Sequence, residues 1–303
     1  IVDKLRDLYQ DDPSNTALAY YYAAQCRKWE LVDDARKAYS EALKIQPAVV
    51  GYRGLAGLRR EQQEFEELLD LLAEGTSKVG DVDVFGDEVK ALIGDKPLMQ
   101  ELYDRATNRT KQERDDVERP VDGLAMAIGL LAIKSKDFDT GDRFMELAIE
   151  AEVPETSEVI MAWGLTLIQE GQNEKAVEVL RRAVDEKIVT DESPLVHYYL
   201  SGALELAGRT DEAVQAARTA AEMRDDDPRF HARVAWILYH ATRYEEATKS
   251  YQQLVDRFDE DHSSSAIRES SKSRRREFVP PMRSRSVRGS HFPVVGSYMK
   301  RFE

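Results

Sequence analysis

Apolar residues recur along residues 1–259 in short runs with helical spacing, and polar turns separate the runs. In the clearest stretch, 157–190, Gly164 and Leu167 precede the turn GQNEK, and Ala176 and Leu180 follow it. Side chains three, four or seven residues apart lie on one face of an α-helix. The pattern therefore predicts two amphipathic helices joined by a short turn.

The same pattern of two helices joined by a turn recurs along the chain at a nearly constant spacing in residues. In most copies a small residue stands near the start of the second helix, and we call the residue at this position the anchor. The anchors Gly141, Ala176, Ala213 and Ala247 are 35, 37 and 34 residues apart, and Ala35 and Leu68 hold the same place in two earlier copies. A second set of small residues lies twelve positions before its anchors: Ala23, Gly129, Gly164, Ser201 and Ala235. Small side chains at both places predict a close approach between two antiparallel helices.

The spacing also predicts weaker copies. Leu68 and Gly141 are 73 residues apart, which leaves room for one degenerate copy within 75–120, with helices near 87–93 and 97–107. Residues 1–10 have the spacing of a second helix, so the chain opens inside a copy. We therefore predict an all-α fold of about six to seven helix pairs over residues 1–261. An irregular helical bundle is the competing interpretation.

These residues resemble the tetratricopeptide repeat family, in a multi-repeat form of bacterial type. The family pattern is W-x₂-L-G-x₂-Y, then A-x₃-F, then a closing proline. The resemblance is strongest over 16–47 and 122–259, although among the copies only Pro47 clearly keeps the proline. It implies a right-handed superhelical solenoid of antiparallel helix pairs. The concave groove of such a solenoid would hold a peptide or a partner protein.

The resemblance further implies that the first helix of each pair lines the groove. We expect a basic region at the N-terminal end, an apolar central region and an aromatic C-terminal region. The predicted groove residues are, in that order, Arg27, Arg53 and Arg60, then Met161, then Tyr198, Trp236 and Tyr239. The alternative is that the apolar members only pack between neighbouring helices. Because tryptophan and tyrosine tend to dominate binding energy, we expect binding to centre on the aromatic region.

Charge and composition limit the classes of partner that this protein is expected to bind. The net charge is −14, and residues 1–261 carry 33 basic against 54 acidic side chains. An acidic surface repels nucleic acid, so we expect no nucleic-acid partner for this region. Cys26 is the only cysteine, which excludes an internal disulfide and a thiolate metal cluster. We find no catalytic motif and no metal-ligand set, and we expect neither enzyme activity, nor a cofactor, nor a membrane span.

Residues 262–303 have a different composition, with ten basic side chains, three acidic ones and ten serines. Three interpretations remain open: a reading-frame change, a disordered spacer, or a basic arm for nucleic acid or anionic surfaces. Since the segment shows no core-forming pattern, we expect it to be dispensable for folding. The repeats before it would then end uncapped, an end through which the protein could self-associate.

Two functions fit these features. The first is a non-catalytic protein-interaction scaffold. The alternative is a helical accessory region of a larger enzyme or envelope-assembly machine whose active domain lies elsewhere. Since the chain begins at Ile1 and not at methionine, the compartment stays open between cytoplasm and periplasm.

Overall fold

The protein is all-helical over the residues that the structure, a computed structural model, describes: 2–115, 122–150, 156–185 and 193–259. The elements, in chain order, are α1 (Val2–Asp11), α2 (Thr16–Lys28), α3 (Val32–Ile45), α4 (Val49–Glu61), α5 (Phe65–Val79), the 3-10 helix η1 (Val82–Phe85), α6 (Asp87–Gly94), α7 (Lys96–Asp115), α8 (Asp122–Lys134), α9 (Phe138–Glu150), α10 (Thr156–Gln169), α11 (Asn173–Asp185), α12 (Pro194–Leu206), α13 (Thr210–Met223), α14 (Pro228–His240) and α15 (Tyr244–Asp259). The predicted all-α class is confirmed. Residues 262–303 lie outside the described residues, so the expectations for that segment stay predictions.

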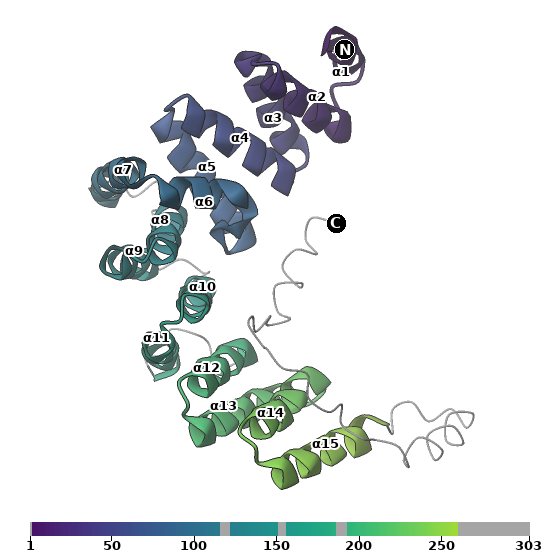
Figure 1. Ribbon diagram of the computed structural model, residues 1–303, viewed down its shortest axis with the longest axis vertical. Helices are drawn as coiled ribbons and strands as arrows, with labels where there is room; N and C mark the ends of the chain where they lie inside the picture. Colours follow the sequence, from purple (N-terminus) through teal and green to yellow (C-terminus); the bar gives the residue numbers. More distant parts are fainter. Residues whose placement is uncertain (1, 116–121, 151–155, 186–192, 260–303) are drawn as a thin grey trace, which may run out of the picture. The chain divides into compact units, whose positions relative to one another are not determined.

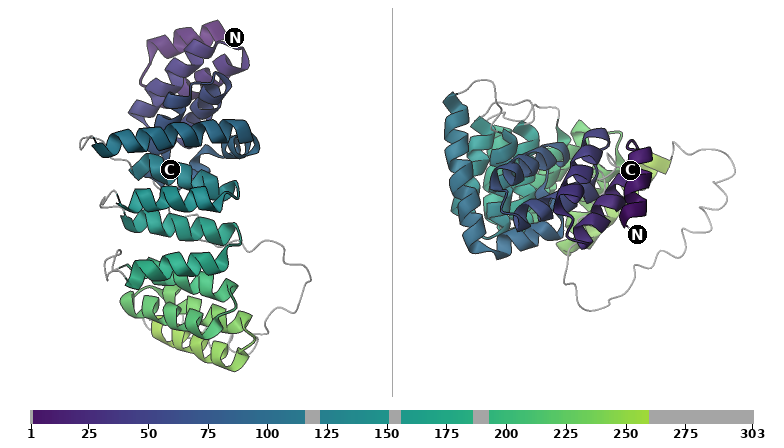
Figure 2. Two further views of the ribbon diagram at one scale, coloured as in Figure 1. Left: turned by 90° about the vertical axis from the view of Figure 1, so that its left-hand side faces the viewer. Right: turned by 90° about the horizontal axis from the view of Figure 1, so that it is seen from above.

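The helices divide into two compact units, with α1–α10 in the first and α11–α15 in the second. In the second unit each helix packs against the next one along the chain (Figures 1 and 2). The first unit has the same succession over α1–α5 and over α8–α10. Within each unit the fold is thus a solenoid of helix pairs, as the repeated pattern predicts.

The close approach predicted from small residues is visible between α8 and α9. A Cβ atom added to Gly129 would lie 2.7 Å from Sδ of Met145 and 3.2 Å from the carbonyl oxygen of Gly141. A Cβ atom added to Gly141 would lie 2.5 Å from Cγ1 of Ile133. Glycine at these two places therefore lets the two backbones meet.

The turns between paired helices share one backbone feature. The fifth residue before each anchor has a left-handed conformation, whether or not it is glycine: Glu30, Gln63, Lys136, Gly171, Gly208 and Thr242. The next backbone N–H then bonds back into the first helix, as Arg209 does to Leu204 and Arg243 to Leu238, both at 2.9 Å. This is the hydrogen bond of a Schellman cap, which satisfies a carbonyl at the helix end. The repeat thus fixes turn geometry as well as helix position.

The two helices predicted within 75–120 are present, but they pack differently from the other pairs. Helices α6 and α7 occupy the predicted places, although α7 runs to Asp115 rather than 107, and DVDVFGD supplies the extra helix η1. Helix α8 packs mainly against α5 and contacts α6 and α7 less extensively. A Cβ atom on Gly123 would lie 3.2 Å from the carbonyl oxygen of Ala73, so α8 starts close against α5.

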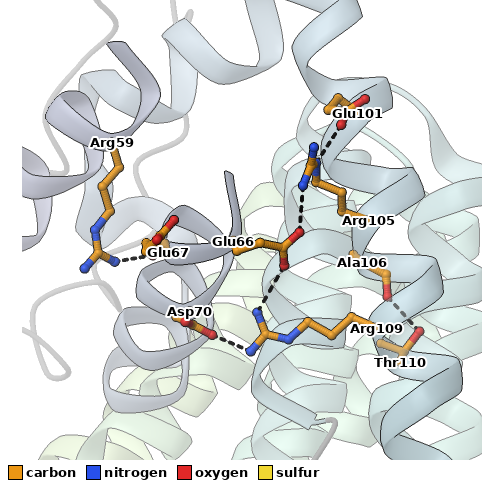
Figure 3. A network of polar contacts seen from close by, with 9 residues as sticks. All are labelled: Arg59, Glu66, Glu67, Asp70, Glu101, Arg105, Ala106, Arg109 and Thr110. Carbon is orange, nitrogen blue, oxygen red and sulfur yellow. Dashed lines mark hydrogen bonds and ion pairs between the residues drawn. The ribbon is translucent and has the colours of Figure 1, made fainter. Parts of the chain in front are cut away.

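Ion pairs hold α7 against α5, as Figure 3 shows. Arg105 of α7 bonds Glu66 of α5 at 2.8 Å and its own neighbour Glu101 at 2.6 Å. One turn later, Arg109 pairs with Asp70. The carboxylates are about half exposed, so each pair contributes no more than about 1 kcal/mol. Their role is to orient α7 rather than to supply most of its stability.

Candidate functional site

An exposed group of aromatic side chains lies at the end of α14 and the start of α15. Helix α14 opens with the N-cap Asp227, whose side chain accepts a hydrogen bond from the Arg229 N–H, and with Pro228 at the first turn. Trp236 and Tyr239, on the third turn of this helix, are 48% and 45% exposed. The rings of Trp236 and His240 are 4.3 Å apart, centre to centre.

The turn between the two helices extends this group. Tyr239 lies 5.7 Å from His240 and 5.6 Å from Tyr244, both in edge-to-face geometry. Because the turn Ala241–Arg243 is short, the first residue of α15 lies beside the last turn of α14. The result is one continuous surface, which we call the aromatic cluster: Trp236, Tyr239, His240 and Tyr244. Contacts between its rings hold it together although it faces solvent.

Tyr198 has a different environment from the two other predicted aromatic residues. It is half-buried, with its ring 5.7 Å from that of Phe230. The guanidinium of Arg233 lies 5.5 Å from the Tyr198 ring centre. Arg233 itself is only 6% exposed and donates to Glu205 at 2.6 Å. Tyr198 therefore belongs to the contact between α12 and α14, beside the partly buried ion pair of Arg233 and Glu205.

The three predicted arginines of the first unit lie near carboxylates and a carbonyl. Arg27 bonds Glu61 at 2.6 Å, and Arg60 bonds Glu88 at 3.0 Å. Arg27 also reaches Glu88, at 3.6 Å, so one network joins α2, α4 and α6. Arg53 is exposed and donates from Nε to the carbonyl of Val84 at 3.2 Å. The positive charge predicted for this region is thus largely balanced by Glu61 and Glu88.

The sequence of the second unit matches a known family. The tetratricopeptide repeat family model matches residues 161–228 and 207–262, which include α12–α15 and the aromatic cluster. Residues 161–262 therefore carry tetratricopeptide repeats. Among curated proteins no sequence matches it.

Solved structures similar to this chain include MamA and YrrB. MamA of AMB-1 is 18% identical, with a TM-score of 0.37 over 69% of this chain and 98% of MamA. A MamA fragment from Desulfovibrio magneticus RS-1 is 12% identical, with a TM-score of 0.39 over 71% and 97%. YrrB, described as a TPR protein with an unusual peptide-binding site, is 11% identical, with a TM-score of 0.32 over 90% and 100%.

Met161 is buried, whereas the other predicted groove residues are exposed or half-buried. Its side chain is only 7% exposed, which fits the packing interpretation for this position. Sequence reasoning missed His240 and Tyr244, although they end α14 and begin α15, on either side of the turn that follows Tyr239. The signal was available, because a turn of three residues brings the end of one helix beside the start of the next.

The described part of the chain gives little support for a metal site, a membrane span or a reactive cysteine. No three His, Cys, Asp or Glu side chains of those residues gather as they would around a metal ion. None of the described helices is long and apolar enough to cross a membrane. Burial raises the pKa of the Cys26 thiol, which leaves this cysteine in its neutral, weakly nucleophilic form.

Proposed function

We propose that this protein is a non-catalytic interaction scaffold that binds a peptide or protein segment through the aromatic cluster. The observation that carries the proposal is the exposure of Trp236 and Tyr239 on one helix of a tetratricopeptide repeat, in ring contact with His240 and Tyr244. Soluble proteins seldom leave several adjoining aromatic rings in water unless the surface binds something. Tyrosine and tryptophan also lose little side-chain entropy when a partner covers them.

The cluster favours a ligand that is apolar on one side and polar at its edges. The ring faces offer apolar contact area, while the hydroxyls of Tyr239 and Tyr244 and the indole N–H of Trp236 can hydrogen-bond. A helix or an extended segment with one large apolar side chain has this character. Tyr198 and Arg233, packed against each other nearby on α12 and α14, hold these helices in place.

In the same proposal the arginines of the first unit form a second contact region. Arg53 is the exposed member, and Arg27 and Arg60 are held by Glu61 and Glu88. A partner with a carboxylate near Arg53 gains a charge-assisted hydrogen bond there. Met161 is buried, and its part is to support the first helix rather than to touch the ligand.

The test compares partner capture by the wild type and by a Trp236→Ala/Tyr239→Ala variant. Covalent crosslinking followed by mass spectrometry identifies the captured protein, and its affinity is then measured with the purified pair. We expect the double variant to bind at least about 30-fold more weakly, because interface hot spots contribute about 2 kcal/mol or more. The fold should persist, because both side chains face solvent.

A Tyr21→Ala/Trp29→Ala variant is the matched control. Tyr21 and Trp29 are exposed aromatic residues of the first unit, so the control removes a similar apolar area elsewhere. Full-strength binding by the Trp236→Ala/Tyr239→Ala variant, with circular dichroism unchanged, would refute the proposal. Unfolding of that variant would show that the cluster is a core feature.

A further inference from the structure

Carboxylates outnumber basic groups at the turn that joins α14 to α15. The guanidinium of Arg243 pairs with two of them, Glu246 at 2.7 Å and Asp211 of α13 at 2.5 Å. Glu245, the residue after Tyr244, is exposed and forms no ion pair within the part of the chain that the structure describes. Three negative charges therefore accompany one positive charge beside the aromatic cluster.

The rings of the aromatic cluster present further negative charge, on their faces. Tyr239 and Tyr244 are both exposed, and their ring planes meet at 64° with 5.6 Å between the ring centres. On its other side Tyr239 meets the ring of His240 at 74°. An aromatic ring is partially negative on its face and partially positive at its edge. Two rings at such a steep angle form a corner that is lined by two faces, and both faces attract a cation.

The second unit already holds one of its own cations between a ring and a carboxylate. The guanidinium of Arg233 lies 5.5 Å from the centre of the Tyr198 ring, and it donates to the Glu205 carboxylate at 2.6 Å. Tyr239, Tyr244 and Glu245 offer the same two components at the aromatic cluster. No cationic side chain of the described residues lies over either of these two tyrosine rings, so the place of the cation is open to a partner.

Arginine is the side chain that suits both components best. Its guanidinium is planar and weakly hydrated, so it stacks on an aromatic ring at a lower desolvation cost than the ammonium of lysine. Its fork of N–H donors also matches the two oxygens of a carboxylate such as that of Glu245. A carboxylate of the partner would instead be repelled at the turn, since like charges brought together weaken binding.

We propose that the partner segment carries an arginine beside its large apolar side chain, and that this arginine binds the corner formed by Tyr239 and Tyr244. The inference rests on the proposed function, which places a segment on the aromatic cluster, and it adds the charge of that segment. The apolar side chain covers Trp236, the guanidinium covers the two tyrosines, and Glu245 balances its charge.

Peptides from a random library test this inference without knowledge of the natural partner. Short peptides displayed on phage are selected on the full chain, and those that also bind the Trp236→Ala/Tyr239→Ala variant are discarded. The tightest peptide is then synthesised in two forms, with arginine and with citrulline in its place. Citrulline has the shape of arginine but no charge. We expect the citrulline form to bind about tenfold more weakly, which is the size of a desolvated cation–π contact.

Variants of the protein locate the effect of the charge. Tyr244→Leu keeps apolar area but removes a ring face, and Glu245→Gln removes the carboxylate. Each should weaken the arginine peptide several-fold more than the citrulline peptide, because such coupling appears only between groups that interact. Tyr21→Leu and Glu222→Gln are the matched controls, on exposed residues of α2 and of the far end of α13, and they should affect the two peptides equally.

The outcomes separate this inference from the proposed function. If peptides that bind through the aromatic cluster contain no arginine, or bind equally well with citrulline, the inference is wrong and the proposed function stands. If no selected peptide distinguishes the wild type from the Trp236→Ala/Tyr239→Ala variant, the proposed function fails and the inference fails with it. Equal effects of Tyr244→Leu on both peptides, with circular dichroism unchanged, would also overturn the assignment of the arginine to this corner.

Discussion

Replacing Gly129 by leucine tests the close contact between α8 and α9. At this position a Cβ atom alone would come within 2.7 Å of Met145 Sδ and 3.2 Å of the Gly141 carbonyl oxygen. The methionine side chain can move, because it has three rotatable bonds. The carbonyl oxygen belongs to the backbone of α9 and can yield only if the two helices separate.

The magnitude follows from two opposing effects. Removing a glycine from a helix interior gains about 1 kcal/mol in alanine and slightly less in leucine. Gly129→Ala adds the strain of the Cβ contacts with Met145 and with the Gly141 carbonyl oxygen, which offsets this gain, so we expect it to be nearly neutral. Gly129→Leu adds three more carbon atoms where Met145 already lies, and overpacking of this kind costs about 1–3 kcal/mol. The backbone contact puts the cost near the upper end, and the expected net loss is about 2 kcal/mol.

Urea unfolding followed by circular dichroism measures these changes, with Gly94→Leu as the matched control. Gly94 ends α6 and has no heavy atom within 4 Å of an added Cβ, so the same chemical change meets no neighbour there. Met145→Ala should restore part of the stability lost in Gly129→Leu, because it vacates the crowded volume. If Gly129→Leu is as stable as Gly94→Leu, the proposed helix contact is wrong.

Two further predictions concern the turns and the response to pH. Gly208 and Thr242 occupy equivalent positions in successive turns, and both have a left-handed backbone conformation. Gly208→Ala should therefore lower the free energy of unfolding by about 1 kcal/mol, and Thr242→Gly should raise it by up to about that amount. Thermal melts in which both changes shift stability in the same direction would contradict this interpretation of the turn. Burial lowers the pKa of His197 below its ordinary value of 6.5. As the pH falls, the unfolded chain therefore binds a proton at this histidine before the folded chain does. The contribution of His197 to stability should be complete above pH 6.5 and should be lost as the pH drops towards the folded pKa. The urea midpoint should therefore decrease less between pH 7 and pH 5 in His197→Gln than in the wild type, and equal decreases would show that His197 is not responsible.

Much of the fold follows from local patterns in the sequence. Helix positions depend on side chains three to seven residues apart, and the pairing depends on small residues such as Gly129 and Gly141 at a constant separation. Both signals lie within one repeat, so they can be seen without knowing what else packs nearby. The degenerate pair α6 and α7 was placed in the same way, by the length of chain between Leu68 and Gly141.

The candidate site depended on contacts between repeats, which the sequence alone does not display. Tyr198 and Tyr239 are both tyrosines of first helices, but Phe230 packs against Tyr198 while Tyr239 stays 45% exposed. Arg27 and Arg60 form a basic region in the sequence, yet Glu88 of α6 comes within reach of both only when the helices stack. The sequence by itself determined the helices, their turns and their pairing, because those interactions are local. Only the tertiary structure decided which side chains face solvent, because exposure depends on whether the next helix covers them.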